Sequence, residues 1–363
     1  MLGRTATGPL KLGLGTISAL AFCGQIGLAQ AQEPTSLPVK VVVVTMFELG
    51  EDTGDRPGEF QTWVERLPLS ERIPFPQGYR DLRYNPEKDV LGLVTGIGTA
   101  RSASSIMALG MDPRFDLSRA YWLVAGIAGA DPNDMSIGSA AWAEWIVDGD
   151  LSHEIDPREM PEGWPTGYTP LRKAEPYAQP VPEDDEGVVY HLDPGLVDWA
   201  YQLTKDVQLV DADALKQLRQ RYVGYPRAQE APKVIKGDNL AAMTFWHGKL
   251  LNDWANEWTE YWTRGRGNFV TTAMEDTGTL QALTWLGKAG RADPKRVLVL
   301  RTASNFSMQH EGITAADSLS GEKKGGYSAY LPSLDAAYLV GSKVVEELTT
   351  NWQRYAEEMP SGG

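Results

Sequence analysis

The chain has 363 residues and an excess of acid, with 48 Asp and Glu against 34 Lys and Arg and a formal net charge of −14 at pH 7. Such a charge argues against nucleic acid or an anionic membrane surface as a partner. The only cysteine is Cys23, so the rest of the chain has no disulfide and depends on a hydrophobic core for its stability.

The N-terminal segment has the pattern of a cleaved export signal. Arg4 and Lys11 are followed by an apolar run, which ends at the small-x-small sequence 29–31. The run is glycine-rich and short for a membrane-spanning helix, which needs ~20 apolar residues. We therefore predict that residues 1–31 are removed and that residues 32–363 are exported, to the periplasm or beyond it. No later apolar run is long enough to span a membrane.

Short apolar runs then alternate with helical patterns. Strands are predicted at 39–46, 90–95, 120–125, 139–147, 268–273 and 296–303. Helices are predicted at 99–110, 195–207, 212–222, 245–263, 276–289 and 333–356. Apolar strands separated by helices are typical of a sheet buried on both faces, so the predicted class is α/β in a single domain. The Pro- and acid-rich segment at about 153–187 is predicted to be a surface insertion, with disorder as the alternative.

Three predicted strands end in small or polar residues, in the stretches VTGIGTARSAS, LVAGIAGADPND and LRTASNFS. Ligands of open α/β sheets bind beyond the carboxyl ends of the strands. Gly96, Gly98, Gly126 and Gly129 would let the backbone approach a ligand closely there, although glycines also simply form tight turns.

Glu275 belongs to the same layer, between the strand-like NFVTTAM and a helical pattern. A helix N-terminus favours the ionised form of a carboxylate, and an ionised carboxylate accepts from two donors at once. The adjacent hydroxyls of a sugar would suit it. The alternative is an acid that only complements the helix dipole.

These segments resemble the nucleoside phosphorylase/nucleosidase superfamily, in the expected order. The resemblance is carried by LVTGIGTARSASSIMAL, YWLVAGIAGADPNDMSIGSAAWAE, TAMEDTGTLQAL and VLVLRTASNFS. A longer stretch, GDNLAAMTFWHGKLLNDWANEWTEYWTRGRGNFVTTAMEDTGTL, resembles the purine nucleoside permease family more specifically. The resemblance implies a nucleoside phosphorylase-like three-layer fold, with a mixed central sheet flanked by helices.

It also implies a purine nucleoside site. Glu275 would hold the ribose 2′- and 3′-hydroxyls with Met274 packed under the sugar, and Asn305, beside Ser304, would contact the purine. Phe245 or Trp246 would supply a flat apolar partner for the base. Thr95, Gly96 and Gly98 would lie near the ribose and its nucleophile, which Glu48 or Glu51 would orient. Gly126 is a further predicted substrate-binding residue.

Two departures from the superfamily leave the function open. Asn305 replaces the aspartate that protonates the departing purine in nucleosidases, and an amide cannot donate that proton. Val124 and Ile127 stand where hexameric phosphorylases bind phosphate, and Arg101 lies one helical turn too late. The first hypothesis is therefore an exported binding component of purine nucleoside uptake. The alternative is cleavage of the N-glycosidic bond by a nucleosidase or, less favoured, a phosphorylase.

The sequence gives no reason to expect a metal or another cofactor. Phosphate as a second ligand and assembly into a homo-oligomer stay open. Trp254, Trp258 and Trp262 share one helix face, which favours the core or an oligomer interface. His247 suits either the pocket or a structural role.

Overall fold

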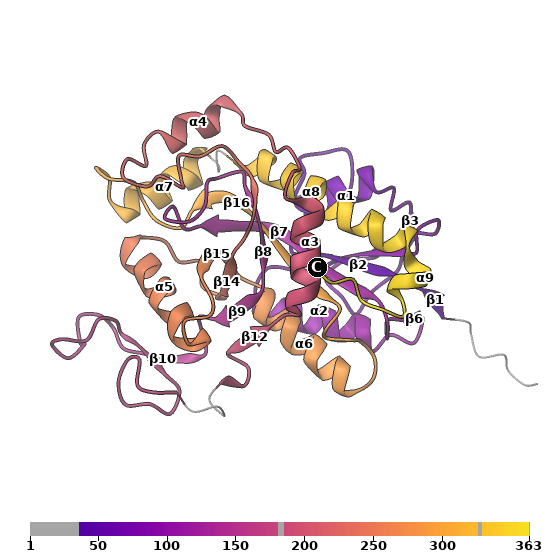
Figure 1. Ribbon diagram of the computed structural model, residues 1–363, viewed down its shortest axis with the longest axis horizontal. Helices are drawn as coiled ribbons and strands as arrows, with labels where there is room; N and C mark the ends of the chain where they lie inside the picture. The colour runs from indigo at the N-terminus through magenta and orange to yellow at the C-terminus, as the bar shows by residue number, and fades with distance from the viewer. Residues whose placement is uncertain (1–35, 181–184, 326–328, 363) are drawn as a thin grey trace, which may run out of the picture. The chain divides into compact units, whose positions relative to one another are not determined.

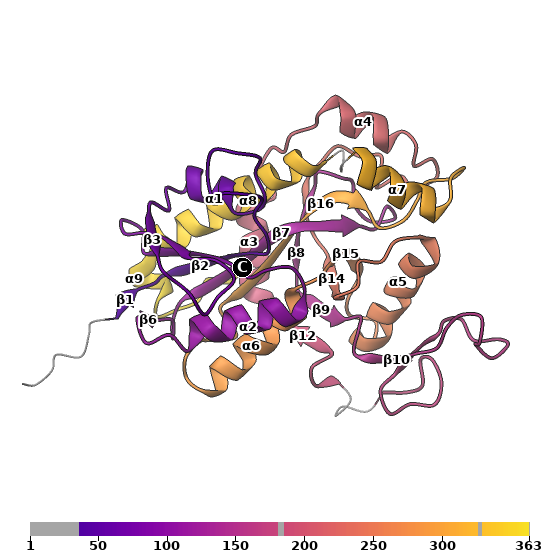
Figure 2. The ribbon, with the colours of Figure 1, turned by 180° about the vertical axis from the view of Figure 1, so that it is seen from behind.

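The computed structural model describes residues 36–180, 185–325 and 329–362 (Figure 1). The predicted export signal lies outside these residues. The fold is α/β, as predicted: a mixed sheet runs through the centre and helices flank it, as both Figure 1 and the reverse view in Figure 2 show. Within the described ranges, no helix has the length and apolar character needed to cross a membrane.

The central sheet has twelve strands in the described residues. In spatial order, one path through it is β12 (Val189–His191), β9 (Trp145–Asp148), β14 (Asp238–Ala241), β15 (Phe269–Ala273), β7 (Tyr121–Ala130), β2 (Val41–Thr45), β5 (Val90–Val94), β4 (Leu82–Asn85) and β3 (Glu71–Ile73). Three further strands join it: β16 (Val297–Phe306) along β7, β8 (Ala140–Ala143) along β16, and β13 (Val234–Lys236) along β8. Two short pairs lie outside it: β1 (Leu37–Pro38) with β6 (Phe115–Asp116), and β10 (Ser152–Glu154) with β11 (Tyr168–Pro170).

Two groups of helices cover the sheet. The long helix α8 (Tyr330–Thr350) packs on β7 and β16, with α1 (Gln61–Arg66), α3 (Pro194–Thr204) and α9 (Trp352–Tyr355) beside it. The helices α2 (Thr99–Gly110) and α6 (Asp276–Lys288) pack against each other, and α5 (Lys249–Thr263) packs on β9 and β15. The remaining helices are α4 (Asp213–Arg219) and α7 (Ala315–Gly325).

The predicted strands are present, with two differences. The predicted strand 139–147 is two strands, because the Asp238 carboxylate accepts the backbone N–H groups of Glu144 and Trp145 at 3.1 and 2.8 Å and turns the chain between β8 and β9. Strands β7 and β16 run on past their predicted ends into the small and polar residues.

The predicted helix at 245–263 begins later, at Lys249. Gly248 stands at its N-terminus with φ of 125°, a backbone conformation that favours glycine. Phe245 and Trp246 therefore lie in the loop that precedes α5, at the end of β14, and not on the helix.

Strand β7 has a gap in its pairing that positions the cavity described below. One edge of β7 pairs with β16 along its whole length. The other edge pairs with β2 as far as Val124 and with β15 from Gly129 onward. In the described part of the chain, no strand pairs with residues 125–128 on that edge, which we call the β7 gap. Backbone groups there are left for side chains or a ligand.

The described residues of the predicted insertion at 153–187 include two tyrosines that pack against α5. Tyr168 stacks on Trp254 with ring centroids 4.4 Å apart, and Tyr177 lies 6.4 Å from Trp258. The tryptophan stripe Trp254, Trp258 and Trp262 is at most 4% exposed, so it belongs to the core of this chain. Burial of large aromatic side chains explains why a Pro-rich segment holds its place.

We expect Gly278→Ala to destabilise the protein by about 1–3 kcal/mol. A Cβ at this position of α6 would lie 2.2 Å from the Thr99 carbonyl oxygen and 2.5 Å from Ser102 Oγ, both on α2. Urea unfolding measures the change. Gly321→Ala in α7 is the matched control: no described atom lies within 4 Å of its Cβ, so better helix propensity should stabilise by up to ~1 kcal/mol. Equal effects would contradict the close α2–α6 packing.

Candidate functional site

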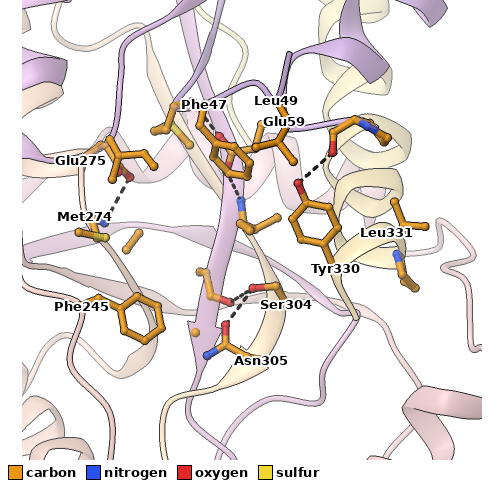
Figure 3. Close-up of a pocket in the computed structure, with 18 of the residues that line it drawn as sticks. Phe47, Leu49, Glu59, Phe245, Met274, Glu275, Ser304, Asn305, Tyr330 and Leu331 are labelled. Carbon is orange, nitrogen blue, oxygen red and sulfur yellow. Dashed lines mark hydrogen bonds between the residues drawn. The ribbon is translucent and has the colours of Figure 1, made fainter. Parts of the chain in front are cut away.

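A cavity of about 1020 Å³ opens at the β7 gap. Its walls come from the end of β2 and the loop after it, the gap itself, the ends of β15 and β16, and the start of α8. Figure 3 shows Glu275 and Met274 on one side, Ser304 and Asn305 at the end of β16, and Tyr330 and Leu331 on the other side. The cavity thus lies where strand ends meet, as the sequence predicted for a ligand site.

Glu275 is held in the wall of this cavity and is 4% exposed. Although it is the residue before α6, its side chain makes no capping hydrogen bond to that helix. Its carboxylate accepts instead from the backbone N–H of Gly98 at 3.0 Å, at the start of α2, and from Met274 N–H at 3.2 Å. Burial raises the pKa of Glu275, whereas the charge of Arg301 and the Gly98 N–H oppose that rise.

Arg301 lies behind Glu275, 1% exposed in the middle of β16. Its guanidinium donates to both carboxylate oxygens of Asp276 at 2.6 and 3.0 Å and to Glu275 Oε2 at 3.3 Å. Burial works to lower the pKa of Arg301, but the charges of Asp276 and Glu275 outweigh it and raise that pKa. Arg301 therefore forms ion pairs with two buried acids at once.

Asn305 and Ser304 both line the cavity although they are consecutive residues of a strand. A bulge in the β16–β7 pairing between Ala303 and Asn305 breaks the usual alternation of side chains and makes this possible. Ser304 Oγ donates to Asn305 Oδ1 at 2.9 Å, and Asn305 Nδ2 donates to the Phe306 carbonyl at 3.1 Å. The amide keeps one N–H and one lone pair for a ligand.

The two predicted aromatic residues occupy different places. Phe245 lines the large cavity and is 44% exposed, so its ring face is available. Trp246 is buried and lines a small adjoining cavity of about 20 Å³, together with Asn305 and Ser307. Phe245 therefore presents an exposed ring to the large cavity, whereas Trp246 packs against Trp254 and Phe269.

Four predicted substrate-binding residues do not line the cavity: Thr95, Gly96, Gly98 and Gly126. Thr95 is buried and its hydroxyl donates to the Gly96 carbonyl at 3.0 Å. Gly98 contributes the N–H that fixes Glu275. Gly126, in the β7 gap, is required sterically, because a Cβ there would lie 2.6 Å from Glu59 Oε1 and 2.8 Å from Arg301 Nη1.

The structure does not bring Glu48 or Glu51 to the cavity wall in the described part of the chain. The Glu48 carboxylate is buried and accepts the backbone N–H groups of Leu49, Gly58, Phe60 and Gln61, so it fastens the loop that leads into α1. Glu51 is exposed. The Glu48 carboxylate oxygens are therefore occupied by backbone N–H groups, and Glu51 is exposed to solvent.

Glu59 is the acid of this loop that lines the cavity, and the sequence analysis did not identify it. Its Oε2 accepts from Met46 N–H at 2.7 Å and its Oε1 from Ile127 N–H at 2.8 Å. The Ile127 amide lies in the β7 gap, so a carboxylate replaces the missing strand partner there. Burial raises the pKa of Glu59 to about 8; Arg301 opposes this and Glu275 adds to it.

Two further candidate residues, Arg101 and His247, do not line the described cavity. Arg101 is exposed and donates to the Ile97 carbonyl at 2.9 Å. Ile127 does line the cavity, whereas His247 is half-buried and is absent from the described lining. Among the described residues, no three His, Cys, Asp or Glu side chains are grouped to hold a metal ion.

Comparison with solved structures supports the fold. The structure of futalosine hydrolase from Helicobacter pylori strain 26695 superposes with a TM-score of 0.50, covering 85% of this chain and 98% of that one at 14% sequence identity. Together with the mixed sheet and its flanking helices, this establishes the nucleoside phosphorylase-like three-layer fold.

Comparison with known sequences is more specific. The chain is 29% identical over 325 residues to the "Purine nucleoside permease" of Candida albicans, covering 88% of this chain and 77% of the relative. It is 29% identical over 346 residues to a "Probable purine nucleoside permease" of Schizosaccharomyces pombe, covering 92% and 94%. The model of the family described as "Purine nucleoside permease (NUP)" matches residues 38–360, which include the whole cavity wall, and the chain belongs to that family.

Proposed function

We propose that the protein is exported, binds purine nucleosides in this cavity and takes part in their uptake. The observation that carries the proposal is that the Glu275 carboxylate and the Asn305 amide both lie in the wall of one cavity (Figure 3). A carboxylate accepts from the two hydroxyls of a ribose, and an amide with one free N–H and one free lone pair complements the edge of a purine. Phe245 offers a flat apolar face for the base.

Export to the periplasm, or secretion, is proposed from the sequence of residues 1–31 alone. It predicts a mature chain shortened at its N-terminus in the secreted or periplasmic fraction, measured by intact-mass analysis after fractionation. A full-length chain in the cytoplasmic fraction would contradict it.

Cleavage of the N-glycosidic bond is the second candidate, and Glu59 favours it. A general acid or base works best when its pKa lies near the working pH, and burial brings the pKa of this cavity residue to about 8. Asn305 can hydrogen-bond the departing purine but cannot protonate it. Water is the proposed nucleophile in preference to phosphate, because Arg301 is committed to Asp276 and Glu275.

The test is an overnight incubation with inosine, adenosine or guanosine, with and without phosphate, assayed for free base and accompanied by calorimetric titration. We expect binding of at least one nucleoside without base release. Release without phosphate would replace this proposal with a nucleosidase, and release only with phosphate with a phosphorylase. Neither binding nor release would refute the purine nucleoside site.

We propose in addition that the protein forms a homo-oligomer. Large apolar side chains that line the cavity are also exposed, namely Leu49, Ile97, Phe245 and Leu331. Contiguous exposed apolar surface is typical of interaction sites. Sedimentation velocity measures the assembly, and a monomer at all concentrations would contradict it.

A further inference from the structure

Glu59 is a buried acid in the cavity wall, and the proposed nucleoside-binding site assigns no role to it. It is 4% exposed, and each of its oxygens accepts one backbone N–H, from Met46 and Ile127. These two bonds fix the carboxyl group in the β7 gap and leave its remaining lone pairs, or a proton, for whatever occupies the cavity that it lines.

The buried acids around Glu59 outnumber the buried cations in the described part of this cluster. Arg301 on β16 is the buried cation of this cluster, and it is already bonded to Asp276 and Glu275 at the start of α6. No Arg301–Glu59 ion pair within 4.0 Å occurs among the described residues, although their charges interact. A third ionised carboxylate would therefore be in excess in a buried site, where an uncompensated charge is costly and the neutral form is favoured.

The other titratable groups near Glu59 do not supply a second buried positive charge. Tyr330 on α8 donates its hydroxyl proton to the Pro57 carbonyl at 2.9 Å, and burial raises its pKa to about 12, so it stays neutral. Arg56 lines the cavity but is exposed to solvent, with its guanidinium 5.6 Å from the Tyr330 ring centroid. Glu48 adds a further negative charge on the same loop.

A neutral carboxyl group carries an O–H donor that needs an acceptor. Met46 and Ile127 present N–H groups, which cannot accept it. The ribose and base of a nucleoside carry several acceptor oxygens and nitrogens, and a bound nucleoside also displaces water that would otherwise stabilise the ionised form. Ligand and proton should therefore favour each other's binding.

We propose that Glu59 is a ligand-binding residue whose carboxyl group is protonated in the nucleoside complex and donates a hydrogen bond to it, so that nucleoside capture is coupled to uptake of a proton. This inference rests on the proposed nucleoside-binding function. It assigns opposite roles to the two cavity acids: Glu275 accepts from the ribose hydroxyls, and Glu59 donates.

The sign of the coupling follows from the pKa of about 8. Below that pH the proton is already present, so affinity is insensitive to pH; above it, binding must take up a proton and weakens roughly tenfold per pH unit. The test is calorimetric titration of the full-length protein with adenosine, whose base does not titrate in this range, from about pH 6.5 to about pH 9.5. At each pH, buffers of different ionisation enthalpy report the number of protons taken up.

We expect the dissociation constant for adenosine to rise above about pH 8, with proton uptake approaching one per ligand. Glu59→Gln, which cannot titrate, should bind with an affinity that no longer depends on pH. Glu65→Gln, an exposed acid on α1, should keep the wild-type profile. Circular dichroism checks that Glu59→Gln is folded; if it is not, the wild-type buffer series decides alone.

Adenosine binding with a constant affinity and no proton uptake across the range would overturn the coupling and leave the nucleoside site standing. Coupling that persists in folded Glu59→Gln would overturn the assignment to Glu59. Absence of adenosine binding at every pH would overturn the inference, and parallel titrations with inosine and guanosine at about pH 7 would show whether the nucleoside site fails with it.

Discussion

Glu275→Ala should weaken purine nucleoside binding by at least about 100-fold. Hydrogen bonds to a charged acceptor contribute roughly 1.5–3 kcal/mol each, and two ribose hydroxyls would lose their acceptor together. The protein should remain folded, because Arg301 keeps both bonds to Asp276 and the space left by the Glu275 side chain, which lines the cavity, can admit water to the Gly98 N–H. Calorimetric titration of the variant measures the loss.

Two comparisons separate ribose recognition from general damage. A 2′,3′-dideoxynucleoside should bind the wild type about as weakly as the intact nucleoside binds Glu275→Ala, because either change removes the same contacts. Glu311→Ala, which removes an exposed acid that is not part of the cavity wall, should bind normally. If Glu275→Ala kept wild-type affinity, the ribose would have to lie elsewhere.

The residues that could be predicted from sequence share one property: they lie in contiguous segments at strand ends. Met274–Glu275 follows a largely buried strand and Ser304–Asn305 lies near the end of another, and the structure places all four residues in the wall of one cavity. Their functional roles are still predictions. Arg301 stood in the same quoted stretch, and a cation inside an apolar strand run was the signal that could have identified it.

Glu59 could not be identified as a cavity residue from a position at the end of an apolar strand. It lies in a loop rich in Gly, Pro and charge, before a helix of six residues that is too short to show a periodic pattern. Several acids follow β2 in sequence, and only the tertiary structure decides which one reaches the β7 gap. Glu48 instead binds the N–H groups of the same loop, which places Glu59 beside Ile127.

The strands of the fold likewise divide into those that the sequence pattern predicted and those that it did not. The continuous apolar runs that became β2, β5, β7 and β16 were predicted because burial on both faces demands such residues. The short strands β3, β4, β12, β13 and β14 were not predicted, since three or four residues carry too little pattern. The β7 gap depends on where β2 ends and β15 begins in space, which the sequence of β7 does not contain.

Arg301→Leu should lower the free energy of unfolding by about 3–5 kcal/mol, because removal of one partner leaves buried charge uncompensated. Asp276 is fully buried, and Glu275 and Glu59 are each 4% exposed. Arg301 lowers the pKa of both glutamates, so its loss raises those values further above their unfolded-state range. A raised folded-state pKa means that stability is lost as pH rises, so the variant should be least stable, relative to wild type, at alkaline pH.

Urea unfolding from about pH 6 to about pH 9.5, which extends above the wild-type pKa of Glu59, measures this effect, and two further variants test its cause. Arg301→Leu combined with Asp276→Leu should recover part of the loss, because replacing both partners of a buried pair by apolar groups is often neutral. Arg119→Leu, which breaks an exposed pair with Glu357, should cost at most about 1 kcal/mol. If the double variant were no more stable than Arg301→Leu, the loss would come from packing and not from charge. The same guanidinium would then matter to the cavity mainly by shape, and the raised pKa of Glu59 would follow from its burial without a contribution from the surrounding charges.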